Sequence, residues 1–331
     1  MKSRSGSQDI LIIKLGSLGD LIVALPAIRQ IFRAHGQNGN AYLLTSPPYA
    51  TLFQGWDGLQ VKTFPRKGPL AAWRMLSWIR RMRFYRIYDL QSNDRTGILC
   101  ALSGAQECVG NHPRFPYRFH PGDRYRGQCH VLERLDEILA SAGLPRHEGL
   151  PEFPVTETSR KHVENWLQTT GLEDRRFVIL HAGTNRTQPQ KRWPCFLDLA
   201  RDLNGRGLEI LWSGGRDDVE INKSLAASVG RDIIGEFTIQ EEVELGRHAR
   251  FAVTNDSAPM HILACAGIPV YGIFGPTDWR RMHAVGQEHR VIALDKPPGS
   301  RENIFIPQDI SKIPLSMVIE KLQEDGLLDP A

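Results

Sequence analysis

Residues 251–278 read FAVTNDSAPMHILACAGIPVYGIFGPTD and contain a complete strand–helix–strand unit. A short apolar run at 251–254 leads into a polar loop at 255–259. A helix is predicted at 260–266, and a second apolar run follows at 269–274. Two short apolar strands that are joined through a helix normally pair in parallel. This stretch therefore predicts a parallel sheet that is covered by helices on both faces.

The same order of elements recurs upstream of this stretch. Apolar strands are predicted at 177–181 and 209–212, and each is followed by a glycine-containing loop. Helices are predicted after these loops, at 194–204 and 219–229. Strands alternating with helices are typical of a doubly wound α/β domain.

A second domain of this kind is predicted near the N-terminus. A strand at 9–15 and a helix at 21–35 flank another glycine-containing loop, and residues 149–154 (GLPEFP) have the prolines of a linker. The sequence thus predicts two Rossmann-like domains, residues 1–154 and 155–331. In such domains ligands bind at the carboxyl ends of the strands.

Length and composition agree with a soluble protein of two domains. The 331 residues are 41% hydrophobic and 24% charged, which argues against a disordered chain. No apolar run approaches the roughly 18–20 residues that a membrane-spanning helix needs, and the N-terminal residues do not match a secretory signal. The five cysteines are scattered without CxxC spacing, so a disulfide framework and a zinc site are disfavoured and a cytoplasmic location is expected.

The small net charge of +4 hides an asymmetry between the two halves. Residues 1–165 carry a charge of +8, and residues 166–331 carry −4. Most of the basic excess lies between Lys62 and Arg126. A basic half indicates an anionic partner or a solvated basic face.

One segment of this basic region, residues 70–86, mixes aromatic, aliphatic and arginine residues. One interpretation is a helix that packs Trp73, Leu76 and Ile79, or their neighbours, inward and leaves its arginines in water. The alternative is a surface for an anionic lipid-linked saccharide at the cytoplasmic face of a membrane.

Three loops carry residues suited to chemistry. The first, Gly16-Ser-Leu-Gly-Asp20, lacks the GxGxxG spacing of dinucleotide-binding proteins. Its Asp20 either caps the following helix or accepts a proton from a substrate hydroxyl. The second loop follows the predicted strand at 177–181 and extends to Pro194, and its Lys191 can reach a phosphate.

The third loop, at 255–259, ends a strand and opens a helix, an arrangement that favours anions. There Asp256 either caps the helix or accepts hydrogen bonds from ribose hydroxyls. His261, among apolar neighbours, is expected in the core.

Taken together, these motifs resemble glycosyltransferase family 9, the bacterial heptosyltransferases of lipopolysaccharide core assembly. The shared pattern is GxxGD at 16–20, KRWP at 191–194 and the run from 255 to 278, within a resemblance from Ile10 to about Val285. It implies the GT-B fold, in which two Rossmann-like domains face each other across a cleft. It also implies transfer of heptose from ADP-heptose to a sugar hydroxyl with inversion. The sequence contains no DxD triplet, so chemistry without a bound metal is expected.

The resemblance assigns roles to individual residues. Asp20 matches the general base. Lys191 matches the lysine that binds the donor diphosphate, and Thr184 precedes it. Further matches on the donor side are Asp256, Ser257 and His261, in the D-[TS]-G-x-x-H element, and Asp217 and Glu220, where a ribose-binding acid is expected. On the acceptor side the matches are Gly19, Arg95, His130 and Arg134, the last two in an H-x-x-E-R element.

The sequence departs from the family at two places. Ala258 replaces the usual glycine, and the loop between Thr184 and Lys191 is longer. The KRWP motif is similar to the enzyme that adds the second core heptose, whereas the N-terminal motif fits that subgroup less well.

These matches predict no cofactor, a nucleotide-sugar donor, and an anionic glycolipid or saccharide acceptor. A peripheral contact with the inner membrane is expected, and no oligomer is indicated. The alternatives are a glycosyltransferase that uses another nucleotide sugar and a GT-B-fold nucleotide-sugar epimerase. The GxxGD spacing disfavours a nicotinamide-dependent oxidoreductase. The acidic second half disfavours a nucleic-acid-binding protein.

Overall fold

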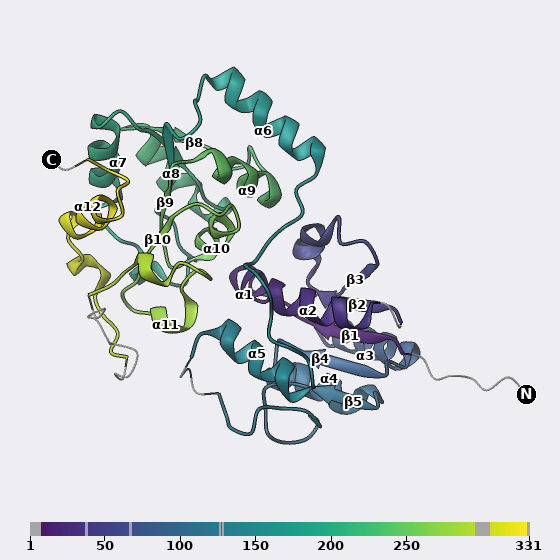
Figure 1. Ribbon diagram of the computed structural model, residues 1–331. Coiled ribbons are helices and arrows are strands. Elements are labelled where there is room, and N and C mark those ends of the chain that lie inside the picture. Colours follow the sequence, from purple (N-terminus) through teal and green to yellow (C-terminus); the bar gives the residue numbers. More distant parts are fainter. Residues whose placement is uncertain are drawn as a thin grey trace, which may run out of the picture. The chain divides into compact units, whose positions relative to one another are not determined.

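The computed structural model describes residues 8–36, 39–65, 68–125, 127, 129–294 and 305–329. The chain divides into two compact units, Met1–Pro154 (unit 1) and Val155–Ala331 (unit 2). Each unit contains one parallel sheet with helices on both faces (Figure 1). The predicted fold class, two Rossmann-like α/β units, is confirmed.

Unit 1 is built on a five-stranded sheet in the order β3-β2-β1-β4-β5, and every pairing is parallel. Its strands are β1 (Ile10–Ile13), β2 (Ala41–Thr45), β3 (Leu59–Thr63), β4 (Arg86–Asp89) and β5 (Glu107–Val109). Its helices are α1 (Leu18–Val23), α2 (Leu25–His35), the 3₁₀ helix η1 (Pro47–Phe53), α3 (Pro69–Met82), α4 (Asp94–Ser103) and α5 (Val131–Ser141).

The first helical region differs from the sequence prediction in one respect. A single helix was expected at 21–35, but the structure has α1 and then α2, separated at Ala24. Pro26 lies in the first turn of α2, where its missing N–H costs nothing. As a result, Asp20 lies in a short separate helix immediately after β1.

Helix α3 packs on the sheet with Ile79 and, partly, Leu76, as one of the two interpretations expected, but Trp73 does not join them. Met75, Trp78 and Ile79 are buried, whereas Trp73 is 64% exposed. At 100° per residue, Trp73 lies opposite the buried side chains and therefore points to solvent. The expectation that Trp73 packs inward is wrong.

Unit 2 contains a six-stranded sheet in the order β11-β10-β9-β6-β7-β8, again parallel throughout. Its strands are β6 (Phe177–His181), β7 (Glu209–Trp212), β8 (Arg231–Asp232), β9 (Ala252–Asn255), β10 (Val270–Ile273) and β11 (Val291–Ile292). Its α-helices are α6 (Glu157–Thr170), α7 (Phe196–Gly205), α8 (Val219–Ala226), α9 (Ile239–His248), α10 (Ala258–Ala264), α11 (Trp279–Met282) and α12 (Leu315–Glu324). Short 3₁₀ helices are η2 (Pro189–Lys191), η3 (Arg216–Asp218), η4 (Glu288–Arg290) and η6 (Ile310–Lys312).

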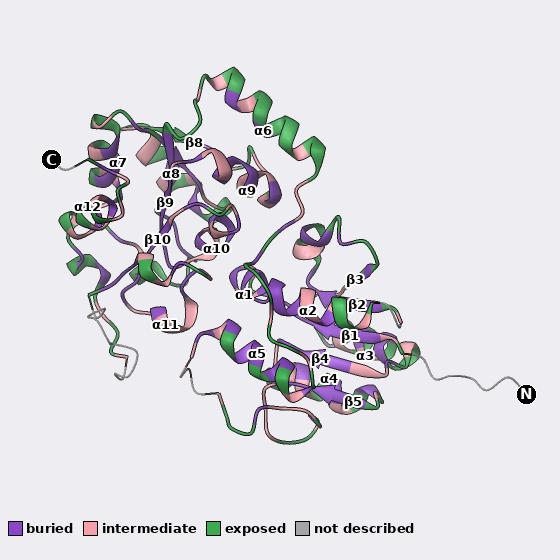
Figure 2. Ribbon diagram, viewed as in Figure 1, coloured by how far each residue is buried: buried purple, intermediate pink, exposed green. Residues whose placement is uncertain are grey.

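The central strands of both sheets are buried on both faces, whereas the edge strand β3 exposes Gln60 and Lys62, and the helices expose one side (Figure 2). Helix α6 shows this clearly, because it buries only Val163 and Leu167. Thr156 caps its N-terminus, and Gly171 ends it in the left-handed conformation. Among the described residues, no helix combines the length and apolarity required to cross a membrane.

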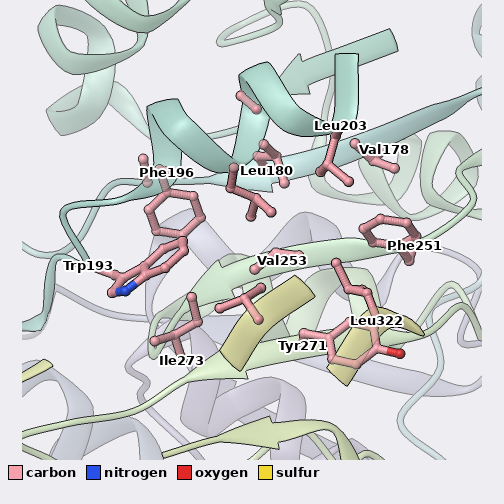
Figure 3. Packing of buried hydrophobic residues seen from close by; sticks show 14 of the residues in the cluster. Val178, Leu180, Trp193, Phe196, Leu203, Phe251, Val253, Tyr271, Ile273 and Leu322 are labelled. Carbon is pink, nitrogen blue, oxygen red and sulfur yellow. The ribbon is translucent and has the colours of Figure 1, made fainter. Parts of the chain in front are cut away.

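The last helix, α12, completes the core of unit 2. Val318 and Leu322 are fully buried with Tyr271 of β10 and Leu203 of α7 (Figure 3). The hydroxyl of Tyr271 also donates to Asp325 at 2.6 Å. Unit 2 therefore takes up the apolar face of α12.

Candidate functional site

The strand order of unit 2 has a topological switch point at the carboxyl ends of β6 and β9, which makes this position a candidate ligand site. These two strands are neighbours, and the sheet grows in opposite directions from them. Such a topological switch point separates the loops that follow the two strands and leaves a crevice for a ligand. The loop after β6 carries Thr184 and Lys191, and the loop after β9 carries Asp256 and Ser257.

A nearly buried ion pair joins these two loops. The ammonium of Lys191 lies 2.7 Å from a carboxylate oxygen of Asp256, and their side chains are 12% and 8% exposed. The hydroxyl of Thr277, after β10, donates to the same oxygen at 2.5 Å. Three strands thus contribute to one cluster, in which Asp256 fixes the direction of the Lys191 cation.

Asn255 and Trp193 hold the loops in place. The Asn255 amide donates to the carbonyls of Ala182 and Gly183 and accepts from the Trp193 backbone N–H at 3.0 Å. The Trp193 indole packs against Phe196 and donates to the carbonyl of Ile313 at 2.8 Å. The loop that carries Lys191 is therefore attached both to β9 and to the segment before α12.

The remaining predicted residues of these loops have different surroundings. Ser257, not Asp256, is the N-cap residue of α10, and Ala258 is its first residue. His261 is 4% exposed on this helix, as expected for a residue of the core. The Thr184 hydroxyl donates to the Gln188 carbonyl at 3.1 Å and so shapes the loop before Lys191.

Asp217 and Glu220 lie after β7 but point to solvent. Their side chains are 58% and 92% exposed, and they form long ion pairs with Arg186 and Lys223. The acid that the fold buries is the one between them, Asp218, which is 5% exposed.

Asp218 is a residue that the sequence analysis missed. It accepts from the Gly215 N–H at 2.9 Å, and its other oxygen lies against Gly183. A Cβ at Gly183 would lie 2.0 Å from that oxygen, so only glycine fits there. The signal in the sequence was the GGRDD stretch after a strand, because two glycines permit the tight turn that directs one aspartate inward. Asp218 thus packs the loop after β7 against the loop after β6.

Two buried titratable side chains, His181 and Glu242, are hydrogen-bonded to Ser213, the residue that follows β7. The Nδ1 atom of His181 lies 3.0 Å from the Ser213 carbonyl, an arrangement that requires a proton on this nitrogen. Burial lowers the pKa of His181, although the nearby Asp218 carboxylate opposes this. Burial also raises the pKa of Glu242, which accepts a hydrogen bond from Ser213.

In unit 1, Asp20 lies at the corresponding switch point, between β1 and β4. It lies in the first turn of α1, half-buried, and accepts from the Ser17 hydroxyl at 3.0 Å. Lys14, at the end of β1, is 5% exposed and donates to the Leu90 carbonyl. Burial lowers the pKa of Lys14, whereas the charges of Asp20 and Asp89 oppose this shift.

Gly16 allows the turn after β1. Gly16 has a φ of +109°, and a Cβ there would lie 2.4 Å from the Tyr49 ring. Gly19 is buried in α1 directly before Asp20. The GxxGD motif therefore places the Asp20 carboxylate beyond the carboxyl end of β1, the central strand of the sheet.

The other predicted acceptor residues are held within unit 1. His130 is the N-cap of α5 and accepts from the Leu132 N–H. The Arg134 guanidinium is 3% exposed and bonded to Asn111, Asp123 and Glu137, so it anchors the preceding loop. Arg95, in the first turn of α4, has a buried Nη2 with no hydrogen-bond partner among the described residues.

The described residues contain no cluster of three histidine, cysteine, aspartate or glutamate side chains arranged to hold a metal ion.

Comparison with known sequences places the chain in a family. A model described as glycosyltransferase family 9 (heptosyltransferase) matches residues 73–303. The chain belongs to glycosyltransferase family 9. The matched range includes Lys191 and Asp256 of the unit 2 cluster, whereas Asp20 precedes it.

Named relatives of this family 9 chain agree in sequence and fold. Lipopolysaccharide heptosyltransferase 2 of Escherichia coli K12 is 26% identical over 65% of this chain and 67% of its own length. A family 9 glycosyl transferase from Veillonella parvula has a TM-score of 0.80 at 19% identity, with 96% of both chains covered. The Escherichia coli ADP-heptose LPS heptosyltransferase II has a TM-score of 0.73 at 18% identity, over 96% of this chain and 98% of its own. The family 9 chain thus has the GT-B fold.

Proposed function

We propose that this protein transfers a heptose from ADP-heptose to a hydroxyl group of a lipopolysaccharide-core-type acceptor, with inversion at the anomeric carbon. The observation that carries the proposal is the Lys191–Asp256–Thr277 cluster at the switch point of unit 2. Its support is family membership and the heptosyltransferase names of the relatives. In this scheme unit 2 binds the donor and unit 1 binds the acceptor.

The donor site needs a cation that is held ready for a diphosphate. Lys191 is nearly buried and already directed by Asp256, so little side-chain entropy is lost when phosphate binds. Thr184 supports the site indirectly, because its hydroxyl donates to the Gln188 carbonyl and so holds the loop that presents Lys191. Because the site is partly shielded from water, the ammonium stabilises charge that develops on the departing diphosphate.

In this proposal Asp20 is the general base. Its carboxylate removes the proton from the acceptor hydroxyl while that oxygen attacks the anomeric carbon from the face opposite ADP. The bond between carbon and the new oxygen forms as the bond to the diphosphate breaks, which gives inversion. The Ser17 hydroxyl holds one carboxylate oxygen in position and leaves the other for the substrate.

The replacement Asp20→Asn tests this assignment. General-base assistance contributes about 10²–10⁴-fold, so kcat should fall by about that factor while donor affinity stays near the wild-type value. Asp94→Asn is the matched control, because Asp94 is also the acidic residue in the first turn of a helix. If Asp20→Asn retained activity within a few-fold of wild type, or if Asp94→Asn lost as much, Asp20 would not be the base.

The donor is tested by thermal unfolding with a panel of ADP-, UDP- and GDP-sugars. A ligand that binds the native state selectively must raise the melting temperature, and ADP-heptose is expected to have the largest effect. A larger effect of another nucleotide sugar would identify a different donor. Incubation with the donor alone, followed by product analysis, excludes or reveals an epimerase.

A further inference from the structure

Unit 1 exposes an unusual number of apolar side chains on one side of its sheet. The described residues contain eight large hydrophobic side chains that are exposed, and five of them lie between positions 70 and 115. We call these five the α3–α4 face: Leu70 (57% exposed), Trp73 (64%), Ile98 (60%), Leu102 (49%) and Phe115 (83%). Single exposed hydrophobic residues are common on proteins, whereas a neighbouring group of them indicates an interaction site.

The two helices present these side chains in the same direction. Helices α3 and α4 pack side by side, and both bury their opposite faces in one core cluster on the sheet. On α3, Leu70 and Trp73 are three residues apart; on α4, Ile98 and Leu102 are four residues apart. Residues at these spacings lie on one face of a helix. The two outward faces therefore form one surface.

Phe115 extends this surface from the loop after β5. It lines a cavity of about 360 Å³ together with Ile98, Ala101 and Pro116. The aromatic ring thus lies beside the apolar side chains of α4 and continues their surface.

Unpaired arginines accompany the apolar side chains. Arg74, Arg80 and Arg81 are exposed on α3, and its sequence contains no acidic residue. Arg83 follows the helix, and Arg114 precedes Phe115; both are exposed. Within the described part of the chain, none of these five arginines forms an ion pair with a carboxylate. In contrast, the more buried Arg86 is paired with Glu107.

We propose that the α3–α4 face binds the surface of an anionic phospholipid bilayer. The arginines meet lipid phosphates, and Trp73, Ile98 and Phe115 insert their side chains at the level of the headgroups. Aromatic rings favour this interfacial region, and basic residues near an anionic leaflet each add to the binding energy. This deepens the proposed function, because a lipid-linked acceptor lies in such a surface.

The test is sedimentation of the full-length protein with phosphatidylcholine vesicles that contain or lack phosphatidylglycerol. The wild type should bind the anionic vesicles, and salt should weaken this binding. Each basic residue contributes about fivefold, so the variant Arg74→Ser/Arg80→Ser/Arg81→Ser should bind about 100-fold more weakly. The matched control, Arg160→Ser/Lys161→Ser/Arg201→Ser, removes the same charge from exposed positions of unit 2 and should bind like the wild type.

A second variant, Trp73→Ser/Ile98→Ser/Phe115→Ser, tests the apolar contribution. It removes only exposed side chains, so its melting temperature should stay unchanged while its vesicle binding falls at least tenfold. The proposal is refuted if the wild type binds no vesicles, or if the charge variant and its control bind equally. It is also refuted if the apolar variant instead converts a wild-type dimer to a monomer, since the face would then bind a second copy.

The two proposals fail separately. Sugar transfer to a soluble core saccharide without vesicle binding would refute only the membrane surface. Vesicle binding by a protein that transfers no sugar would refute only the glycosyltransferase activity.

Discussion

The ion pair between Lys191 and Asp256 makes a quantitative prediction about stability. Lys191→Met keeps most of the side-chain volume but removes the charge, leaving a nearly buried carboxylate without its cation. Breaking a buried pair in this way costs about 3–5 kcal/mol. The cost here should be near 3 kcal/mol, at the low end of that range. One reason is that the two side chains retain 12% and 8% exposure. The other is that Thr277 still donates to the carboxylate.

The double variant Lys191→Met/Asp256→Asn distinguishes the cost of leaving one charge unpaired from the contribution of the whole ion pair. Asparagine removes the uncompensated charge and still accepts the hydrogen bond from Thr277. Replacing both members of a buried ion pair is often close to neutral, so the double variant should recover to within about 1 kcal/mol of the wild type. The two substitutions are therefore expected to be strongly non-additive.

The assay is hydrogen exchange in increasing urea, read from peptides that cover β6 and β9. A local readout is needed because the chain has two units and a single global signal would mix their transitions. In thermal unfolding of a domain of this size, a loss of about 3 kcal/mol corresponds to a decrease in melting temperature of about 6–12 °C. If Lys191→Met and the double variant were destabilised equally, the ammonium would not be compensating the Asp256 carboxylate, and the reasoning would be wrong.

Two further predictions concern the turn beneath this cluster. Gly183→Ala should destabilise unit 2 by about 1–3 kcal/mol in urea unfolding, because its Cβ would meet the Asp218 carboxylate at 2.0 Å. The second change Asp218→Gly should recover part of that loss, and no recovery would contradict the assigned clash. The lowered pKa of His181 means that the unfolded chain binds more protons than the folded one below pH about 6.5, so the unfolding free energy should fall as the pH decreases through this range. His181→Gln should make this decline shallower, and an unchanged pH profile would show that His181 does not titrate differently on unfolding.

The strands were the part of the fold most accessible to prediction. β6 and β7 have the predicted limits, because continuous apolar runs between polar loops leave few alternatives. Helix boundaries were harder to predict. The expected helix at 21–35 divides at Ala24, and Trp73 is on the outer face of α3, because burial depends on which turn of the helix meets the sheet.

The residues of the candidate site were likewise only partly predictable from the sequence. Lys191, Asp256 and Thr184 could be placed at one sheet edge, since each follows a parallel strand. Among three acidic residues after β7, however, the sequence did not distinguish Asp218 from Asp217 and Glu220. The backbone turn at Gly215 makes this distinction, and its direction depends on contact with the loop after β6. His130 and Arg134 likewise show their local roles only once their hydrogen-bond partners are known.

The hydrogen bond from the Trp193 indole to the Ile313 carbonyl has a consequence for the folding of unit 2 during synthesis. Trp193 lies two residues from Lys191, yet its partner belongs to a segment that leaves the ribosome 120 residues later. The loop that presents the cation therefore acquires its final support only after synthesis has passed Ile313. Shortening the chain before Ile313 would leave every residue of the cluster present but would remove this support and the buried face of α12.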